Sequence, residues 1–171
     1  KAKTNRQDYY QDQKTTAFRL FNGEGDGLGG LIIDLYQDYA VFSWYNDTLY
    51  GKKATIIQAF QKVFPEVLGA YEKVRFESQL PESQLLYGQT ASEPLIVQEN
   101  GINYATYMNE GLMTGIFLDQ KEVRGALVAG LASGKRVLNM FSYTGAFSVA
   151  AAMGGALQTT SVDLAKRSVP K

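Results

Sequence analysis

The sequence predicts an α/β protein in two parts, an α+β part over residues 1–113 followed by the first strands and helix of a doubly wound sheet over residues 114–171. Three observations support this prediction. At 45% hydrophobic and 20% charged residues, the composition is that of an ordinary globular protein. The first part has short β-branched and aromatic runs and one segment of helical periodicity. The second part has the order strand, loop, small-residue helix, strand, and its last strand ends at Asp163.

The first part begins with an expected antiparallel meander, formed by runs at Phe18–Phe21, Leu31–Leu35 and Tyr39–Tyr45. The segment Gly23–Gly30 between the first two runs holds five glycines in eight residues, a density typical of a turn. A phosphate-binding loop is the alternative. Because two carboxylates in the segment, Glu24 and Asp26, would repel a phosphate, we expect a hairpin connection instead.

A helix is expected next, over Thr48–Phe64, where apolar residues recur at intervals of three and four. Asn46 or Asp47 would cap this helix, and Pro65 would stop it. The remaining elements of the first part are a strand within Val67–Phe76, a loop at Pro81–Gly88, and a hairpin of Leu95–Glu99 and Ile102–Tyr107 around Asn100-Gly101.

The second part begins with Asp119 and Glu122, which have the spacing of a capping box and predict a helix that ends at Gly134. The elements that follow are a strand at Arg136–Asn139, a small-residue helix at Gly145–Met153 and a strand at Thr159–Val162. Two parallel strands joined by one crossover helix leave apolar faces and edges unpaired. We therefore expect that the domain continues in further chain, ordered or disordered, or that a partner chain covers the exposed edge. A homodimer is a candidate assembly.

A ligand of a doubly wound sheet lies beyond the carboxyl ends of its strands. Asn139 is at such an end, and Gly145 allows a close approach of the backbone where strand turns into helix. Asp163 follows Gly145 by 18 residues, close to the spacing at which an acid binds ribose hydroxyls. The loop carries Phe141 and Tyr143 where a dinucleotide site would have glycines, so a nucleoside is favoured over NAD. The structural alternative is an ordinary α/β turn with a surface Asp.

Composition excludes several kinds of chemistry. The 171 residues contain no Cys and no His, which excludes a disulfide scaffold, a thiolate zinc site and a cysteine nucleophile within them. We predict no metal site. No segment approaches the roughly 20 apolar residues of a membrane span, and no signal peptide is visible, so a cytoplasmic location is expected.

Charge is unevenly distributed along the chain. Residues 1–23 carry five basic and two acidic side chains. Residues 24–118 carry five basic and twelve acidic side chains, and residues 119–171 carry seven basic and three acidic ones. The basic ends would orient a polyanion, which makes RNA a candidate partner.

Three stretches resemble one enzyme family: Asn139–Ala156 together with Ser161–Leu164, Thr114–Arg124, and Phe18–Asp34. They resemble bacterial S-adenosylmethionine-dependent methyltransferases of large-subunit ribosomal RNA, most closely the 5-methylcytosine enzymes with an N-terminal PUA domain. The resemblance implies an α+β middle domain followed by the first strands and helix of a Rossmann-like methyltransferase domain. It implies that S-adenosyl-L-methionine is the cofactor and ribosomal RNA the substrate.

The resemblance also assigns roles to single residues. The methionine part of the cofactor would be surrounded by the loop of Phe141, Tyr143, Thr144 and Gly145, and Asp163 would bind the ribose hydroxyls. Gln120 and Arg124 lie four residues apart on one helical face and would approach the cofactor, or else form a solvated face. Asn139 completes the predicted cofactor set.

The departures from the family pattern concern catalysis. A 5-methylcytosine enzyme needs a thiolate to attack C6 of the base, and this sequence has no Cys, so we expect the catalytic residues C-terminal to Lys171. The PUA domain and an Asp/Asn-Pro-Pro element are also absent from these residues. We therefore expect a fragment that is inactive alone. The alternative function is a non-catalytic module that binds RNA or protein.

Overall fold

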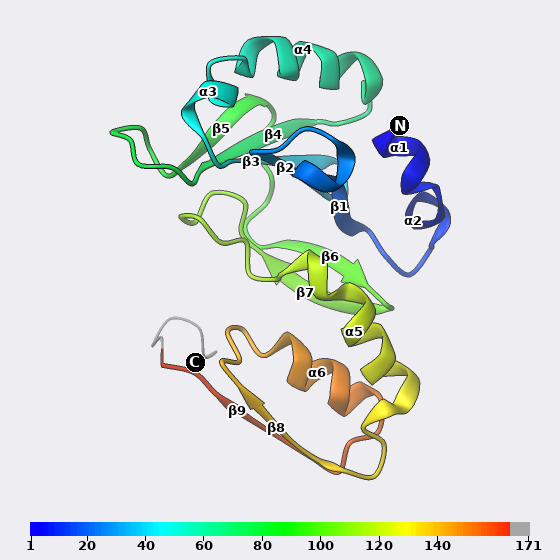
Figure 1. The fold of residues 1–171 in the computed structure, drawn as a ribbon. Helices are drawn as coiled ribbons and strands as arrows, with labels where there is room; N and C mark the ends of the chain where they lie inside the picture. Colours follow the sequence, from blue (N-terminus) through cyan, green and yellow to red (C-terminus); the bar gives the residue numbers. More distant parts are fainter. Residues whose placement is uncertain (165–171) are drawn as a thin grey trace.

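The computed structural model describes residues 1–164, and its strands form three separate sheets (Figure 1). Three basic residues counted above, Lys166, Arg167 and Lys171, lie outside the described residues. The first sheet has the order β1 (Ala17–Asn22), β2 (Leu31–Tyr36), β3 (Tyr39–Trp44), β4 (Gly69–Val74), β5 (Ser83–Gly88). The second is the hairpin β6 (Leu95–Glu99) and β7 (Ile102–Thr106), and the third pairs β8 (Arg136–Met140) with β9 (Gln158–Val162).

The expected meander is confirmed, because β1, β2 and β3 pair in antiparallel order. The glycine-rich segment is the β1–β2 connection, as predicted, and contains the short 3-10 turn η1 (Gly23–Asp26). Its Asp26 carboxylate accepts two hydrogen bonds from the Arg6 guanidinium at 2.6 Å, at the helical N-terminus formed by α1 (Ala2–Asn5) and α2 (Gln7–Gln11). The acid in this loop therefore anchors the N-terminus.

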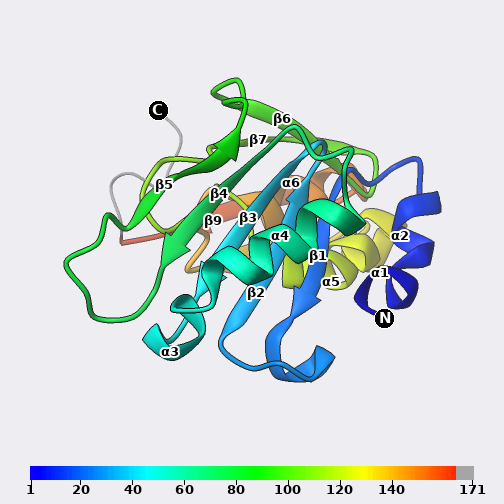
Figure 2. The same cartoon turned by 90° about the horizontal axis from the view of Figure 1, so that it is seen from above.

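A parallel pairing of β3 with β4 follows the meander, and it requires a crossover connection. The crossover is helical, but it forms two helices, α3 (Asp47–Tyr50) and α4 (Lys53–Val63), where the periodicity predicted one. Asn46 caps the first of them, since its Oδ1 accepts from the backbone N–H of Leu49 at 2.8 Å. Figure 2 shows α4 lying across the strands.

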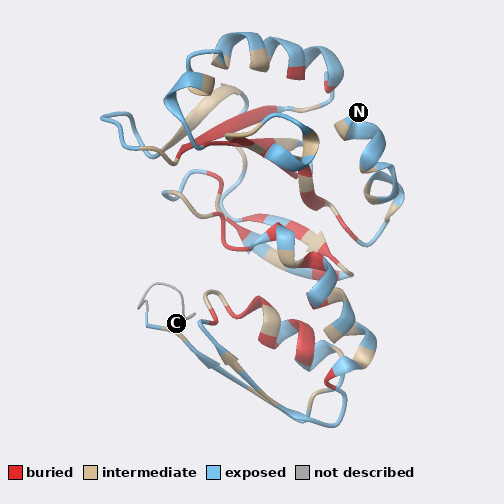
Figure 3. Ribbon diagram, viewed as in Figure 1, coloured by how far each residue is buried: buried red, intermediate tan, exposed pale blue. Residues whose placement is uncertain are grey.

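Both faces of the first sheet are covered, which explains why β3 is buried along most of its length. Phe42 and Trp44 pack with Phe60 of α4 on one face. Val41, the residue before Phe42, belongs to a second cluster with Val97 of the hairpin. Side chains thus alternate between the two cores with the two-residue period of a strand. Figure 3 shows this burial concentrated in the first sheet and the hairpin below it.

The segment expected to be a loop at Pro81–Gly88 contains strand β5, so that prediction is wrong. Among residues 1–164, β5 is an edge strand that pairs with β4 alone, in antiparallel order. Its residues are partly buried without a clear alternation, so no two-residue period marks the strand in the sequence.

The predicted helix after Asp119 is present, but its capping box is wrong. It begins with the 3-10 turn η2 (Leu118–Gln120) and continues as α5 (Lys121–Ala126) and the π-helical η3 (Leu127–Leu131). Gln120 occupies the N-cap position of α5 without a side-chain cap bond, and Asp119 instead accepts from the Gln120 amide at 3.1 Å. The early 3-10 turn shifts the helix start away from Asp119.

The third sheet confirms the predicted order strand, helix, strand. β8 and β9 are parallel, and α6 (Ala146–Met153) connects them and packs against both. Gly154 ends the helix against the backbone of Leu127, where a Cβ would overlap the carbonyl oxygen. Leu138 and Met140 are exposed on the other face, which no described element covers (Figures 1 and 3).

The described part of the chain has no helix long and apolar enough to cross a membrane. It also has no group of three or more His, Cys, Asp or Glu side chains placed to hold a metal ion.

Lys73, at the end of β4, holds the connector between the hairpin and the second part. Its fully buried side chain donates to the carbonyls of Met108 at 2.7 Å and Gly111 at 2.5 Å, and to the Ser83 hydroxyl at 2.8 Å. Burial, together with the positive charge of Arg75, lowers the pKa of Lys73 to about 8.

The lowered pKa of Lys73 predicts a pH-dependent stability. Unfolded, the side chain returns to its ordinary pKa of 10.5, so the unfolded chain binds more protons between pH 8 and 10.5. The contribution of this group to the free energy of unfolding therefore rises as pH increases through that window. We expect urea denaturation to show this rise in the wild type as pH increases from about 8 towards 10.5, and not in Lys73→Met. Parallel pH profiles for the two proteins would contradict it.

Arg124 and Glu99 form a buried ion pair between α5 and β6. Both side chains are 1% exposed, and the guanidinium donates to the two carboxylate oxygens at 2.6 and 2.7 Å. It also donates to the carbonyl of Phe117 at 2.7 Å. The pair fixes the helix to the hairpin.

Removing one member of this pair should be far more costly than removing both. We expect Arg124→Met to lower the free energy of unfolding by about 3–5 kcal/mol, because Glu99 is left buried without its partner. The double variant Arg124→Met/Glu99→Leu should recover most of that loss. A double-mutant cycle by urea denaturation measures both, and additive losses would contradict the expectation.

Candidate functional site

The candidate site is the loop between β8 and α6, at the carboxyl ends of the parallel strands (Figure 1). Three of its residues have positive φ: Phe141 at 57°, Tyr143 at 49° and Gly145 at 83°. Only glycine adopts this region at no cost, and each of the two aromatic residues costs about 1–3 kcal/mol there. The loop therefore depends on bonds from its surroundings to keep this shape.

The first of these bonds comes from the end of β9. Asp163 accepts a hydrogen bond from the backbone N–H of Tyr143 at 2.7 Å. One residue earlier in each segment, the N–H of Ser142 donates to the carbonyl of Val162 at 3.0 Å. The acidic residue thus lies at the loop, beside the strained backbone, and its predicted role toward a ribose stays a prediction.

Further bonds come from Gly115, before the helix of the second part. The hydroxyl of Tyr143 accepts from the N–H of Gly115 at 3.0 Å, and the hydroxyl of Thr144 donates to its carbonyl at 2.7 Å. Burial raises the pKa of Tyr143 above its ordinary value, while the hydrogen bond from Gly115 opposes that rise. Phe117 adds a ring contact with Tyr143, with centroids 5.2 Å apart.

A cavity of about 170 Å³ opens between the loop and the start of α6. Its lining consists of Ser142, Tyr143, Thr144, Gly145, Ser148, Val149 and Ser161. The hydroxyl oxygen of Ser142 is buried and has no hydrogen-bond partner among the described residues. An orphaned buried hydroxyl at a cavity, in a loop that a carboxylate holds, fits a polar ligand such as a nucleoside.

The predicted site residues divide into three groups. The structure brings five together at the loop, namely Phe141, Tyr143, Thr144, Gly145 and Asp163, of which Phe141 is 87% exposed. Asn139 lies beside them but turns toward α6, where its amide donates to the Ser148 hydroxyl at 3.1 Å. Gln120 donates to Asp119 and Arg124 is held by Glu99, and within residues 1–164 neither side chain hydrogen-bonds to the loop.

Sequence reasoning missed Gly115 and Ser142, and also the cavity-lining residues Ser148, Val149 and Ser161. Gly115 lies within the quoted Thr114–Arg124 stretch, so its place in a motif was a usable signal. Ser142 lies inside the loop motif, but nothing in the pattern of residue types shows that its hydroxyl is buried without a partner.

Known proteins share this chain's sequence and fold. The family model of S-adenosylmethionine-dependent methyltransferases matches residues 73–171. A Bacillus subtilis protein provisionally named ribosomal RNA large subunit methyltransferase YwbD is 51% identical over 174 residues, covering 100% of this chain and 44% of the relative. Ribosomal RNA large subunit methyltransferase I of Aeromonas salmonicida is 37% identical over 170 residues, covering 96% of this chain and 42% of the relative.

A solved structure matches as well. The crystal structure of SMU.776, provisionally described as a methyltransferase and complexed with S-adenosylhomocysteine, is 56% identical with a TM-score of 0.92. The match covers 98% of this chain and 43% of that one, so the chain spans less than half the length of these relatives. The mixed α/β fold is thus that of a methyltransferase structure, while the boundary at residue 113 stays a prediction. The chain belongs to the family of S-adenosylmethionine-dependent methyltransferases.

Proposed function

We propose that this chain supplies the first half of the cofactor site of an enzyme that methylates large-subunit ribosomal RNA. The observation that carries the proposal is the hydrogen bond from the Tyr143 N–H to Asp163, which fixes a carboxylate against the strained loop that lines the cavity. The names of the relatives support ribosomal RNA as the substrate.

In this proposal each element of the site has a separate task. The carboxylate of Asp163 binds the ribose hydroxyls, and the loop of Phe141, Tyr143, Thr144 and Gly145 encloses the methionine part. The unpartnered hydroxyl of Ser142 offers one further polar contact. When bound, S-adenosylmethionine supplies a methyl group activated by its sulfonium. Gln120 stays a proposed second contact to the cofactor. The Arg124 side chain has a structural role instead, through its ion pair with Glu99.

We propose cytosine C5 as the methylated position, from the resemblance to 5-methylcytosine enzymes. The chemistry needs a thiolate that adds to C6 of the base, and the 171 residues contain no Cys. The nucleophile would therefore lie C-terminal to Lys171, and the chain alone would be inactive. A cytoplasmic location and a homodimer stay predictions.

The cofactor assignment predicts a loss of affinity on neutralising Asp163. Isothermal titration calorimetry of the natural protein that carries this chain should show S-adenosylhomocysteine binding. Asp163→Ala should bind it at least about tenfold more weakly, because hydrogen bonds to a charged group contribute about 1.5–3 kcal/mol. Asp38→Ala, which removes an exposed carboxylate from the β2–β3 turn, is the matched control.

Two results would overturn the cofactor assignment: no binding by the wild type, or equal binding by Asp163→Ala and the wild type. Because Asp163 also accepts from the Tyr143 N–H, Asp163→Asn should be measured in parallel. The amide oxygen can keep that backbone bond, so weak binding by this variant points to lost ribose contacts rather than to a collapsed loop.

A further inference from the structure

A second, smaller cavity lies between the first sheet and the connector to the methyltransferase segment. Its volume is about 50 Å³, and it is lined by residues of β1 to β4 and by the stretch from Leu112 to Leu118. Tyr143 of the cofactor loop also lines it. The cavity therefore adjoins the candidate cofactor loop, and none of its residues on the first sheet has a task in the proposed cofactor binding.

The cavity has an excess of positive charge. Its ionisable side chains other than tyrosine are Arg19, Asp34, Lys73 and Arg75. Arg19 is paired with Asp34 at 2.9 Å. The three hydrogen bonds of Lys73 to Ser83, Met108 and Gly111 use the donors of its ammonium group. Lys73 therefore contributes charge, but it has no donor left for a ligand.

Arg75 is different, because it retains an unused donor. One of its terminal nitrogens donates to the carbonyl of Leu112 at 2.6 Å. Its Nε is buried and has no hydrogen-bond partner among the described residues. A guanidinium with an unpartnered N–H, at a cavity with net positive charge, fits a phosphate oxygen.

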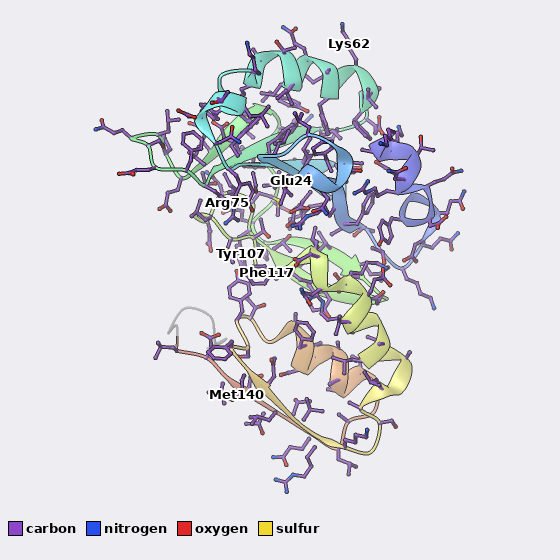
Figure 4. The ribbon with its side chains drawn as sticks, viewed as in Figure 1. Glu24, Lys62, Arg75, Tyr107, Phe117 and Met140 are labelled. Atoms are coloured by element: carbon purple, nitrogen blue, oxygen red, sulfur yellow. The ribbon has the colours of Figure 1, made fainter. Side chains whose placement is uncertain are left out.

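Aromatic rings stand at the same cavity. Tyr45 is 46% exposed, and its ring centroid lies 5.8 Å from the Arg75 guanidinium carbon. Phe117 is 44% exposed on the other side of the cavity, next to Tyr143. Figure 4 shows Arg75 and Phe117 in the region between the first sheet and the methyltransferase segment, whereas Lys62 projects from α4 at the far end. Exposed rings beside cationic groups bind single-stranded nucleic acid by stacking on bases.

The size of the cavity decides which part of a nucleotide can enter it and which part stays outside. At about 50 Å³ it is far below the roughly 300–1,000 Å³ of a pocket for a whole small molecule. A base would not fit inside, but a single phosphate group would, with the adjoining base outside against an exposed ring.

We propose that the Arg75 cavity binds one backbone phosphate of the RNA strand that carries the target base, with an adjoining base stacked on Tyr45 or Phe117. The proposal rests on the proposed function, since it assumes an RNA substrate. It assigns the first sheet a direct part in holding that substrate next to the cofactor loop.

The salt dependence of RNA binding tests this proposal. Fluorescence anisotropy of a labelled single-stranded RNA oligonucleotide, with the natural protein that carries this chain, gives the affinity at several salt concentrations. Arg75→Gln should weaken binding and reduce the slope of log affinity against log salt by about 0.7, the value for one phosphate contact on a single strand. Lys62→Gln removes one exposed positive charge from α4 and should leave the slope unchanged.

A second variant keeps every charge and tests stacking. Tyr45→Ala should weaken RNA binding at least about fivefold with the wild-type salt slope. Arg75→Gln loses the hydrogen bond to Leu112, and it would be uninformative if it failed to fold. Tyr45→Ala then still tests whether RNA binds at this cavity. An unchanged affinity of Tyr45→Ala and of the corresponding Phe117→Ala would overturn the stacking part.

The remaining outcomes separate this proposal from the cofactor assignment. The phosphate site would be overturned if Arg75→Gln kept the wild-type salt slope of RNA binding, or if Arg75→Gln and Lys62→Gln lost RNA affinity equally. Either result could occur with S-adenosylhomocysteine binding intact, so it would leave the cofactor assignment standing. Binding of inorganic phosphate at constant ionic strength without binding of RNA would overturn it in favour of a free-anion site. Failure of the wild type to bind S-adenosylhomocysteine would contradict the proposed function instead.

Discussion

The loop between β8 and α6 keeps a strained shape because hydrogen bonds reach it from two separate segments. Asp163 holds the backbone of Tyr143 from the end of β9, and Gly115 holds the side chains of Tyr143 and Thr144 from the connector. Without those bonds, the positive φ values of Phe141 and Tyr143 would relax to ordinary conformations. The shape of the candidate cofactor site therefore depends on residues outside the loop.

The same dependence connects the site with the first sheet. Gly115 belongs to the connector whose earlier carbonyls, at Met108, Gly111 and Leu112, accept hydrogen bonds from Lys73 and Arg75 on and just after β4. Thr114 adds a bond of 2.8 Å to Tyr36 at the end of β2. The first sheet thus positions the connector, and the connector positions the loop. This continuity gives a physical reason for a cofactor segment and an α+β part to occur in one chain.

Local patterns predicted the parts of the structure that local interactions determine. The meander, the hairpin at Asn100-Gly101 and the unit of β8, α6 and β9 follow from periodicity and glycine positions, and the structure confirms them. Strand β5 was not predicted because its own residues lack a two-residue alternation of burial. It is a strand because it hydrogen-bonds to β4, which is a non-local interaction. The ion-pair partner of Arg124 was not predicted either, since Glu99 lies 25 residues earlier in the sequence and on another element. Helical spacing places a side chain on a face but does not show what buries that face.

The most direct test of the account is an amide NMR titration of the natural protein with S-adenosylhomocysteine. If the loop and the end of β9 form the cofactor site, the largest shift changes should fall on Ser142 to Gly145 and on Asp163, with a smaller response at Gly115 through its bonds to the loop. The glycine-rich segment Gly23–Gly30 should remain unchanged. Saturable changes centred on that segment, with none at Ser142 to Gly145, would contradict the account.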